Sequence, residues 1–210
     1  MTNDVQILNN GYPMPAVGLG VYKIADEQME EVVRTALDAG YRSFDTAYFY
    51  GNEKALGSAL KQSNIERDEL FITSKLWNDY QGYDQTIEYF NKSLDNLGLD
   101  YLDLFLIHWP CENDQLYIES YKALEHLYEE GKIKAIGVCN FKIQHLEKLM
   151  RETKITPQVN QIELHPYFNQ QDVQDFCDEH DIKVTAWMPL MRNKGLLDDP
   201  VITDIAHRYD

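Results

Sequence analysis

Four polar side chains with complementary chemistry lie at or just beyond the ends of three short apolar stretches. Asp45 and Tyr50 belong to the stretch 44–53, where Asp45 closes a short strand and Tyr50 follows in the loop. Lys75 and His108 each end a later apolar stretch. If the three strands are neighbours in a parallel sheet, the four side chains converge at one edge. A tyrosine beside a lysine and a histidine can donate a proton to a substrate, so this group is the candidate catalytic site.

The rest of the chain alternates between short apolar strands and amphipathic helices. Each strand is typical of one that is covered on both faces, and regular strand–helix alternation predicts a parallel α/β architecture. In a barrel of this kind, the carboxyl ends of the strands form the catalytic face. We expect residues 1–210 to form one domain, with no linker or internal boundary. The expected strands are 17–21, 43–47, 71–76, 102–108, 133–139, 157–163 and 183–188, and the expected helices are 27–39, 53–61, 84–97, 117–130, 142–151, 170–180 and 199–209.

Two glycines give local signals. Asn10-Gly11 is a two-residue turn signal between the short stretches 5–10 and 14–16, which predicts an N-terminal β-hairpin at the closed end of the barrel. Gly40 follows the first helix and is expected to cap it.

Each of the four candidate residues also has an ordinary structural interpretation. Asp45 could cap a helix, Tyr50 could be a rim aromatic among 14 tyrosines, and Lys75 could be a surface charge. His108 could be a buried histidine with satisfied hydrogen bonds. For Lys75 and His108 taken alone, the structural interpretation is the stronger one. The placement of all four at three consecutive strand ends favours catalysis.

Composition and spacing exclude several other classes. The 210 residues carry a formal net charge of −16 and no basic stripe, so a nucleic-acid partner is not expected. No signal peptide or membrane span is evident. The three scattered cysteines suggest reduced thiols in the cytoplasm. Gly18-Leu19-Gly20 lacks the third glycine of a dinucleotide fingerprint, and the histidines and cysteines show no metal-ligand spacing, so no metal is expected.

Seven ordered segments give the chain a family resemblance. It resembles the aldo-keto reductases, and most of all their microbial diketogluconate-reductase and prostaglandin-synthase-like branch. The resemblance implies a (β/α)8 TIM barrel and NADPH-dependent reduction of a small aldehyde or ketone. The segments are PMPAVGLG at 13–20, FDTAYFYGNE at 44–53, TSKLW at 73–77, LIHWP at 106–110, AIGVCNF at 135–141, NQIELHP at 160–166 and AWMPL at 186–190.

The resemblance also implies roles for individual residues. Tyr50 would be the general acid, Lys75 would lower its pKa, Asp45 would hold Lys75, and His108 would orient the substrate oxygen. The implied cofactor-binding positions are Gly20, Val21, Asp45, Cys139, Asn140, Gln161, Trp187, Met188 and Leu190. The implied substrate-binding positions are Tyr22, Phe49, Trp77, His108 and Trp109. The structural alternatives are strand-end capping for the two amides and plain packing for the aromatics.

The chain departs from the family pattern in two ways. Cys139 and Met188 stand where serines are usual, and a thiol donates weakly while a thioether cannot donate a hydrogen bond. Seven strands and seven helices are expected, so the eighth βα unit and the family's 2′-phosphate clamp have no counterpart in these residues. Two outcomes stay open: an active reductase, or a truncated barrel without turnover that serves as a fragment, regulator or binding protein. We expect weak NADPH binding and self-association through the free edges of strands 17–21 and 182–186.

Overall fold

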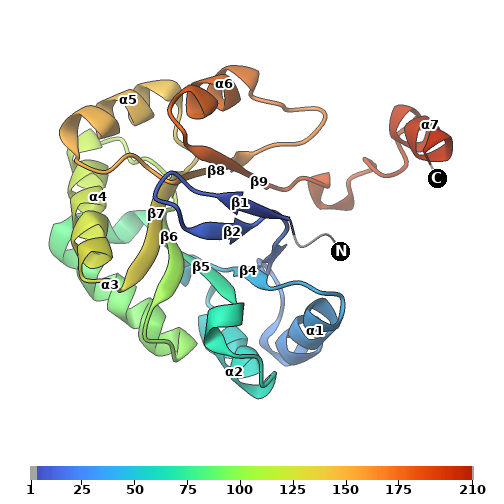
Figure 1. The fold of residues 1–210 in the computed structure, drawn as a ribbon, viewed down its shortest axis with the longest axis horizontal. Helices are drawn as coiled ribbons and strands as arrows, with labels where there is room; N and C mark the ends of the chain where they lie inside the picture. The colour runs from blue at the N-terminus through green and yellow to red at the C-terminus, as the bar shows by residue number, and fades with distance from the viewer. Residues whose placement is uncertain (1–3, 210) are drawn as a thin grey trace.

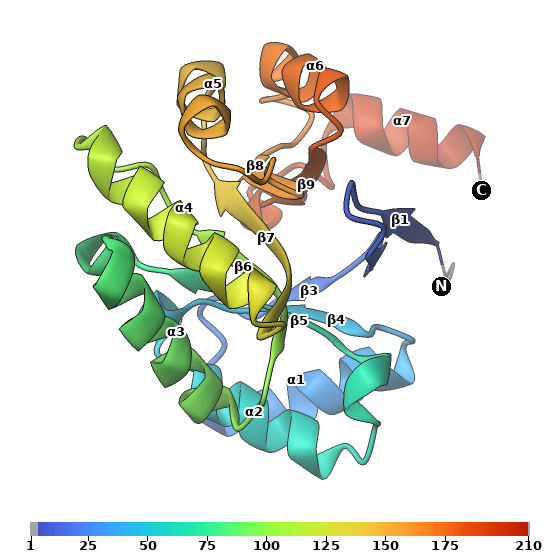
Figure 2. The same cartoon turned by 60° about the vertical axis from the view of Figure 1, so that its left-hand side comes forward.

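A computed structural model describes residues 4–209 and contains one curled, parallel sheet of seven strands in the order β3-β4-β5-β6-β7-β8-β9. Strand neighbours follow chain order, and the helices lie on the outside of the curl (Figure 1, Figure 2). This arrangement confirms the predicted βα-barrel architecture. The strands are β1 Val5–Ile7, β2 Pro13–Pro15, β3 Leu19–Gly20, β4 Ser43–Asp45, β5 Phe71–Leu76, β6 Leu102–Ile107, β7 Ile133–Cys139, β8 Val159–Glu163 and β9 Lys183–Trp187; the helices are α1 Asp26–Asp38, α2 Glu53–Gln62, α3 Tyr83–Leu97, α4 Asp114–Glu129, α5 Ile143–Glu152, α6 Gln171–Glu179 and α7 Pro200–Arg208.

Local chemistry sets several helix boundaries. The Asn113 side chain accepts a hydrogen bond from the Gln115 N–H and caps α4, and Asp199 caps α7 in the same way, with Pro200 in its first turn. The C-cap residue of α1 is Ala39 and not the predicted Gly40. Gly40 is the next residue, and it has a φ of 93°. The left-handed conformation at Gly40 ends α1.

Two clusters of buried side chains pack on the sheet, one on each face. Outward-facing side chains such as Phe44, Ile72 and Phe105 pack against the helices in the larger core. Inward-facing side chains fill the inside of the curl, and Phe71 and Leu104 belong to this smaller cluster. Side chains alternate between these two clusters along each strand. This alternation decides which polar residues at the strand ends point inward.

The predicted hairpin is present, but its loop differs from the two-residue turn. β1 and β2 pair antiparallel, and three loop residues, Asn9 to Gly11, lie between Leu8 and Tyr12, which remain hydrogen-bonded. Gly11 has a φ of 83°, so the loop is the three-residue type with a left-handed last position.

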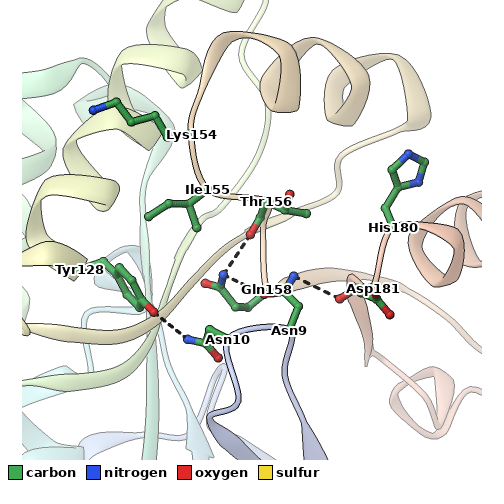
Figure 3. A pocket seen from close by; sticks show the side chains of 9 residues that line it. All are labelled: Asn9, Asn10, Tyr128, Lys154, Ile155, Thr156, Gln158, His180 and Asp181. Atoms are coloured by element: carbon green, nitrogen blue, oxygen red, sulfur yellow. Dashed lines mark hydrogen bonds between the residues drawn. The ribbon is translucent and has the colours of Figure 1, made fainter.

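The hairpin closes the end of the barrel opposite the candidate site. Asn9 donates to the carbonyls of Pro157 and Asp181, at distances of 3.1 and 3.2 Å, and Gln158 donates to Asn9 at 3.0 Å. Figure 3 shows these side chains around a hollow of about 440 Å³. Its central amides are bonded to one another and to the backbone, so the hollow is a seam between the hairpin and the sheet.

The two edge strands of the sheet differ from the strands between them. Within residues 4–209, β3 and β9 each pair on one side only, and they do not pair with each other. β3 is shorter than the predicted 17–21, and every residue of β9 is half-buried. Figure 1 shows α7 standing away from the other helices, and none of its described side chains is buried. No helix in the described part of the chain is both long and apolar enough to cross a bilayer.

Candidate active site

Three of the predicted catalytic side chains point inward at the ends of adjacent strands. Asp45 ends β4, Lys75 is the last inward-facing residue of β5, and His108 directly follows β6. β4, β5 and β6 are hydrogen-bonded neighbours. The structure brings these side chains together, as strand order and the alternation of side chains predict.

Lys75 lies at the centre of this group. Its side chain is 1% exposed, and its Nζ donates to Asp45 Oδ1 and, at 2.9 Å, to the carbonyl of Thr46. Burial is the largest single influence and lowers the pKa of Lys75, but Asp45, Tyr50 and Cys139 together raise that pKa above its usual value. Lys75 is therefore a fixed, buried ammonium at neutral pH.

Tyr50 approaches the ammonium from the loop after β4. The short 3₁₀ helix Tyr48–Tyr50 ends at Gly51, whose φ of 73° turns the chain into α2. The ring centroid of Tyr50 lies 5.3 Å from Lys75 Nζ and 5.7 Å from the centroid of the His108 ring. Burial raises the pKa of Tyr50 by more than Lys75 lowers it. The predicted lowering by Lys75 is present, but burial of the phenol, which local sequence pattern does not reveal, makes the net shift upward.

His108 is neutral at physiological pH. Burial, helped by the charge of Lys75, lowers its pKa to about 3. Its Nδ1 is buried without a hydrogen-bond partner among the described residues. A neutral imidazole carries one N–H donor and one acceptor nitrogen, so His108 can donate to an oxygen without adding charge to the site.

A second group of predicted residues lies on β7, β8 and β9 or directly after β7. Cys139 is the last residue of β7, and its register partner Gln161 is the middle residue of β8, with Sγ and Oε1 4.0 Å apart. Asn140 has a φ of 63°, a conformation that asparagine tolerates, and its Oδ1 accepts from Trp187 Nε1 at 2.8 Å. Gln161 Nε2 donates to Asp45 Oδ2 at 2.9 Å, which joins this group to the first.

The other predicted cofactor positions differ from one another in their exposure to solvent. Gly20 and Leu190 are exposed, and Met188 has a φ of 56° in the turn after β9. Val21 has a fully buried side chain, its N–H donates to the Asp45 carbonyl, and its carbonyl accepts from Asn52. Its role at the cofactor site stays a prediction.

The predicted substrate-binding aromatics gather near Tyr50 and His108. Phe49 stacks on Trp77 with ring centroids 3.8 Å apart, and the Trp77 ring lies 5.3 Å from that of His108. The Tyr22 ring lies 4.8 Å from that of Tyr50. Trp109 directly follows His108 and is 40% exposed.

Sequence reasoning did not identify the bonds that hold the Tyr50 loop. The Thr46 hydroxyl donates to Asn52 Oδ1 at 2.9 Å, and Asn52 Nδ2 donates to the Val21 carbonyl at 2.8 Å. The available signal was that Thr46 and Asn52 flank the segment 47–51, which contains only alanine, glycine and aromatic residues. Among residues 4–209, no three His, Cys, Asp or Glu side chains cluster in a way that could hold a metal ion.

Comparison with known proteins identifies the family. The model of the "Aldo/keto reductase family" matches residues 16–210. The chain is 48% identical over 208 residues to a glyoxal reductase of Bacillus subtilis, covering 99% of this chain and 74% of that protein. A solved aldo/keto reductase from Brucella melitensis is 46% identical with a TM-score of 0.94, covering 99% of this chain and 80% of that one. A mutant of the Gox0644 protein, solved in complex with NADPH, is 41% identical with a TM-score of 0.93, covering 100% of this chain and 75% of that one. The chain therefore belongs to the aldo/keto reductase family.

Proposed function

We propose that this protein reduces aldehydes or ketones to alcohols with NADPH, and that Tyr50 donates the proton. The observation that carries the proposal is the buried ammonium of Lys75, held by Asp45 beside the rings of Tyr50 and His108. A carbonyl oxygen that gains negative charge needs both a proton and a nearby positive charge, and this group supplies both.

The protein's part in the reaction follows from the states of these side chains. Tyr50 keeps its proton at neutral pH because burial raises its pKa. The adjacent Lys75 ammonium stabilises the phenolate that remains once the proton has gone to the substrate oxygen. His108, neutral because its pKa is about 3, donates a hydrogen bond to the same oxygen and orients it. Asp45 keeps Lys75 charged and in place.

The second group has hydrogen-bonding capacity that suits a nicotinamide. Asn140 Nδ2 makes one bond, to the His108 carbonyl at 3.0 Å, and keeps a second N–H, while Gln161 Oε1 has only the distant Cys139 thiol. A carboxamide needs one donor and one acceptor, which these two amides can provide, and Trp187 would lie against the ring. NADPH supplies the hydride when bound. Cys139 is a weak donor and Met188 is none, so we expect modest affinity.

The aromatic mouth supports a small carbonyl substrate. Tyr22, Phe49, Trp77 and Trp109 present ring surface beside the donors, as small-molecule sites commonly do. Because a similar protein is a glyoxal reductase, short dicarbonyls are the first substrates to test.

Two further proposals concern the whole chain. We propose one domain and a cytoplasmic location, which the three unpaired cysteines support. We also propose self-association through the sheet edges. Free strand edges are templates for pairing, and the exposed Val201 and Ile205 on α7 add apolar surface.

The direct test is NADPH oxidation, followed by absorbance, with glyoxal and methylglyoxal. We expect Tyr50→Phe to lower the turnover rate by a factor on the order of 10²–10⁴ while leaving NADPH affinity nearly unchanged. Tyr121→Phe is the matched control, because it also removes a phenol oxygen, here a buried one that has no hydrogen-bond partner among the described residues. A Tyr50→Phe protein that turns over as fast as the control would remove Tyr50 from the mechanism.

A further inference from the structure

Gln161 makes a contact that its expected role as a cofactor ligand does not explain. Its Nε2 donates to Asp45 Oδ2 at 2.9 Å, while the other oxygen of Asp45 accepts from Lys75. The carboxylate is therefore held from two sides. Three strands separate β4 from β8 in the curled sheet (Figure 1), so this bond runs across the inside of the barrel.

We propose that Gln161 is a positioning residue that acts through Asp45 on the Lys75 ammonium and so sets the acidity of Tyr50. An N–H donor offsets part of the charge on Oδ2 and fixes the plane of the carboxylate, which leaves Oδ1 directed at Lys75. Only the final link, from the acidity of Tyr50 to catalysis, rests on the proposed function.

The electrostatics of Tyr50 give the direction of the effect. After burial, the two largest influences on its pKa are opposed: Lys75 lowers it and the Asp45 carboxylate raises it. Without the Gln161 N–H, the charge of Asp45 is less compensated and acts more strongly on both neighbours. Loss of this donor therefore raises the pKa of Tyr50.

Holding Asp45 leaves Gln161 free for a second contact. Its Nε2 carries two hydrogens and gives one to Asp45, and its Oε1 is 4.0 Å from the nearest thiol. The same amide can thus meet a carboxamide while it holds Asp45. Gln161 is 7% exposed, so water competes little for either contact.

The test is the titration of Tyr50 in the ligand-free protein, followed by ¹⁹F NMR after incorporation of 3-fluorotyrosine. The Tyr50 signal is the one that Tyr50→Phe removes, and the fluorine lowers phenol pKa values into a mild pH range. We expect Gln161→Met, which keeps the length but lacks the donor, to raise the pKa of Tyr50 by roughly half a unit or more. Gln158→Met is the matched control, because Gln158 is also buried but lies at the closed end, and it should leave the Tyr50 titration unchanged.

A double-mutant cycle separates a positioning role from general disturbance of the site. In an Asp45→Asn background, Gln161→Met should shift the Tyr50 titration by less than a third of its effect in the parent. An undiminished shift in that background, or no shift in the parent, would overturn the proposal. Failure of the proposed function would look different, because Tyr50→Phe would then keep its turnover while the ligand-free titrations stayed as predicted.

Discussion

The buried pair of Lys75 and Asp45 is asymmetric, and its two single substitutions should differ in cost. The Lys75 side chain is 1% exposed and the Asp45 side chain 23%. Asp45→Asn leaves a buried ammonium whose acceptors, the Asn oxygen and the Thr46 carbonyl, are both neutral, and an uncompensated buried charge costs about 3–5 kcal/mol of unfolding free energy. Lys75→Met leaves a carboxylate that still accepts from Gln161 and partly meets water, so we expect a loss of about 1–2 kcal/mol.

The pH dependence of stability should also differ between parent and variant. In the parent, the raised pKa of Lys75 means that the pair contributes its full stability below about pH 10.4, the ordinary lysine value, and loses it as the pH rises through the folded-state pKa. In Asp45→Asn, burial without the carboxylate lowers the pKa of Lys75. The loss of unfolding free energy caused by the buried Lys75 ammonium is then largest at neutral pH and becomes smaller as the pH approaches about 10.4. Between pH 7 and 10 the contribution of this group should be flat in the parent and should rise in Asp45→Asn.

Urea unfolding at several pH values measures both effects. The exposed pair Lys148–Asp114 is the control, since breaking it should cost at most about 1 kcal/mol. The double variant Asp45→Asn/Lys75→Met should recover most of the loss caused by Asp45→Asn, because no buried charge remains. Equal losses in the two single variants, or a double variant no more stable than Asp45→Asn, would refute the reasoning.

Three further predictions follow from the site and the sheet edges. The pKa of His108, lowered to about 3, means that stability falls as the pH drops from about 6.5 toward 3, by at most about 1.4 kcal/mol per pH unit; His108→Gln should flatten acid unfolding curves in that range. NADPH should quench tryptophan fluorescence, and Trp187→Leu should abolish most of the quench; an unchanged quench would place Trp187 away from the nicotinamide. Sedimentation of the purified chain should show concentration-dependent association, reduced in Val201→Glu/Ile205→Glu, whereas a monomer at all concentrations would contradict the proposed use of the edges.

Sequence reasoning found the parts of the site that depend on local pattern. Lys75 and His108 could be placed because each ends an apolar strand, and alternation along a strand then fixes the direction of its last side chains. β5 and β7 match their predicted bounds, and the other interior strands differ from theirs by one or two residues at one end. The first strand was predicted as 17–21 and is only Leu19–Gly20, since an edge strand has one partner to define it.

The parts that were missed depend on distance along the chain or on depth. Gln161 and Asp45 are 116 residues apart, and no local signal indicates that one amide hydrogen will meet that carboxylate. The net shift in the pKa of Tyr50 could not be predicted for a related reason. Lys75 is visible in the sequence as a charge, whereas the burial that outweighs it exists only after three strands and a loop have packed.

The docking of the hairpin has a consequence for biosynthesis. Asn9 bonds to the carbonyl of Asp181, 172 residues later in the chain. At a translation rate of roughly 5–20 residues per second, the first residues wait about 10–35 s after their own synthesis before this partner exists. During that interval Leu8 and Met14, which end up in the inner core, have no complete surface on which to pack. Docking of the hairpin is therefore complete only after β8 and the Asp181 turn have been synthesised, and until then the nascent chain carries apolar side chains that lack their final packing partners.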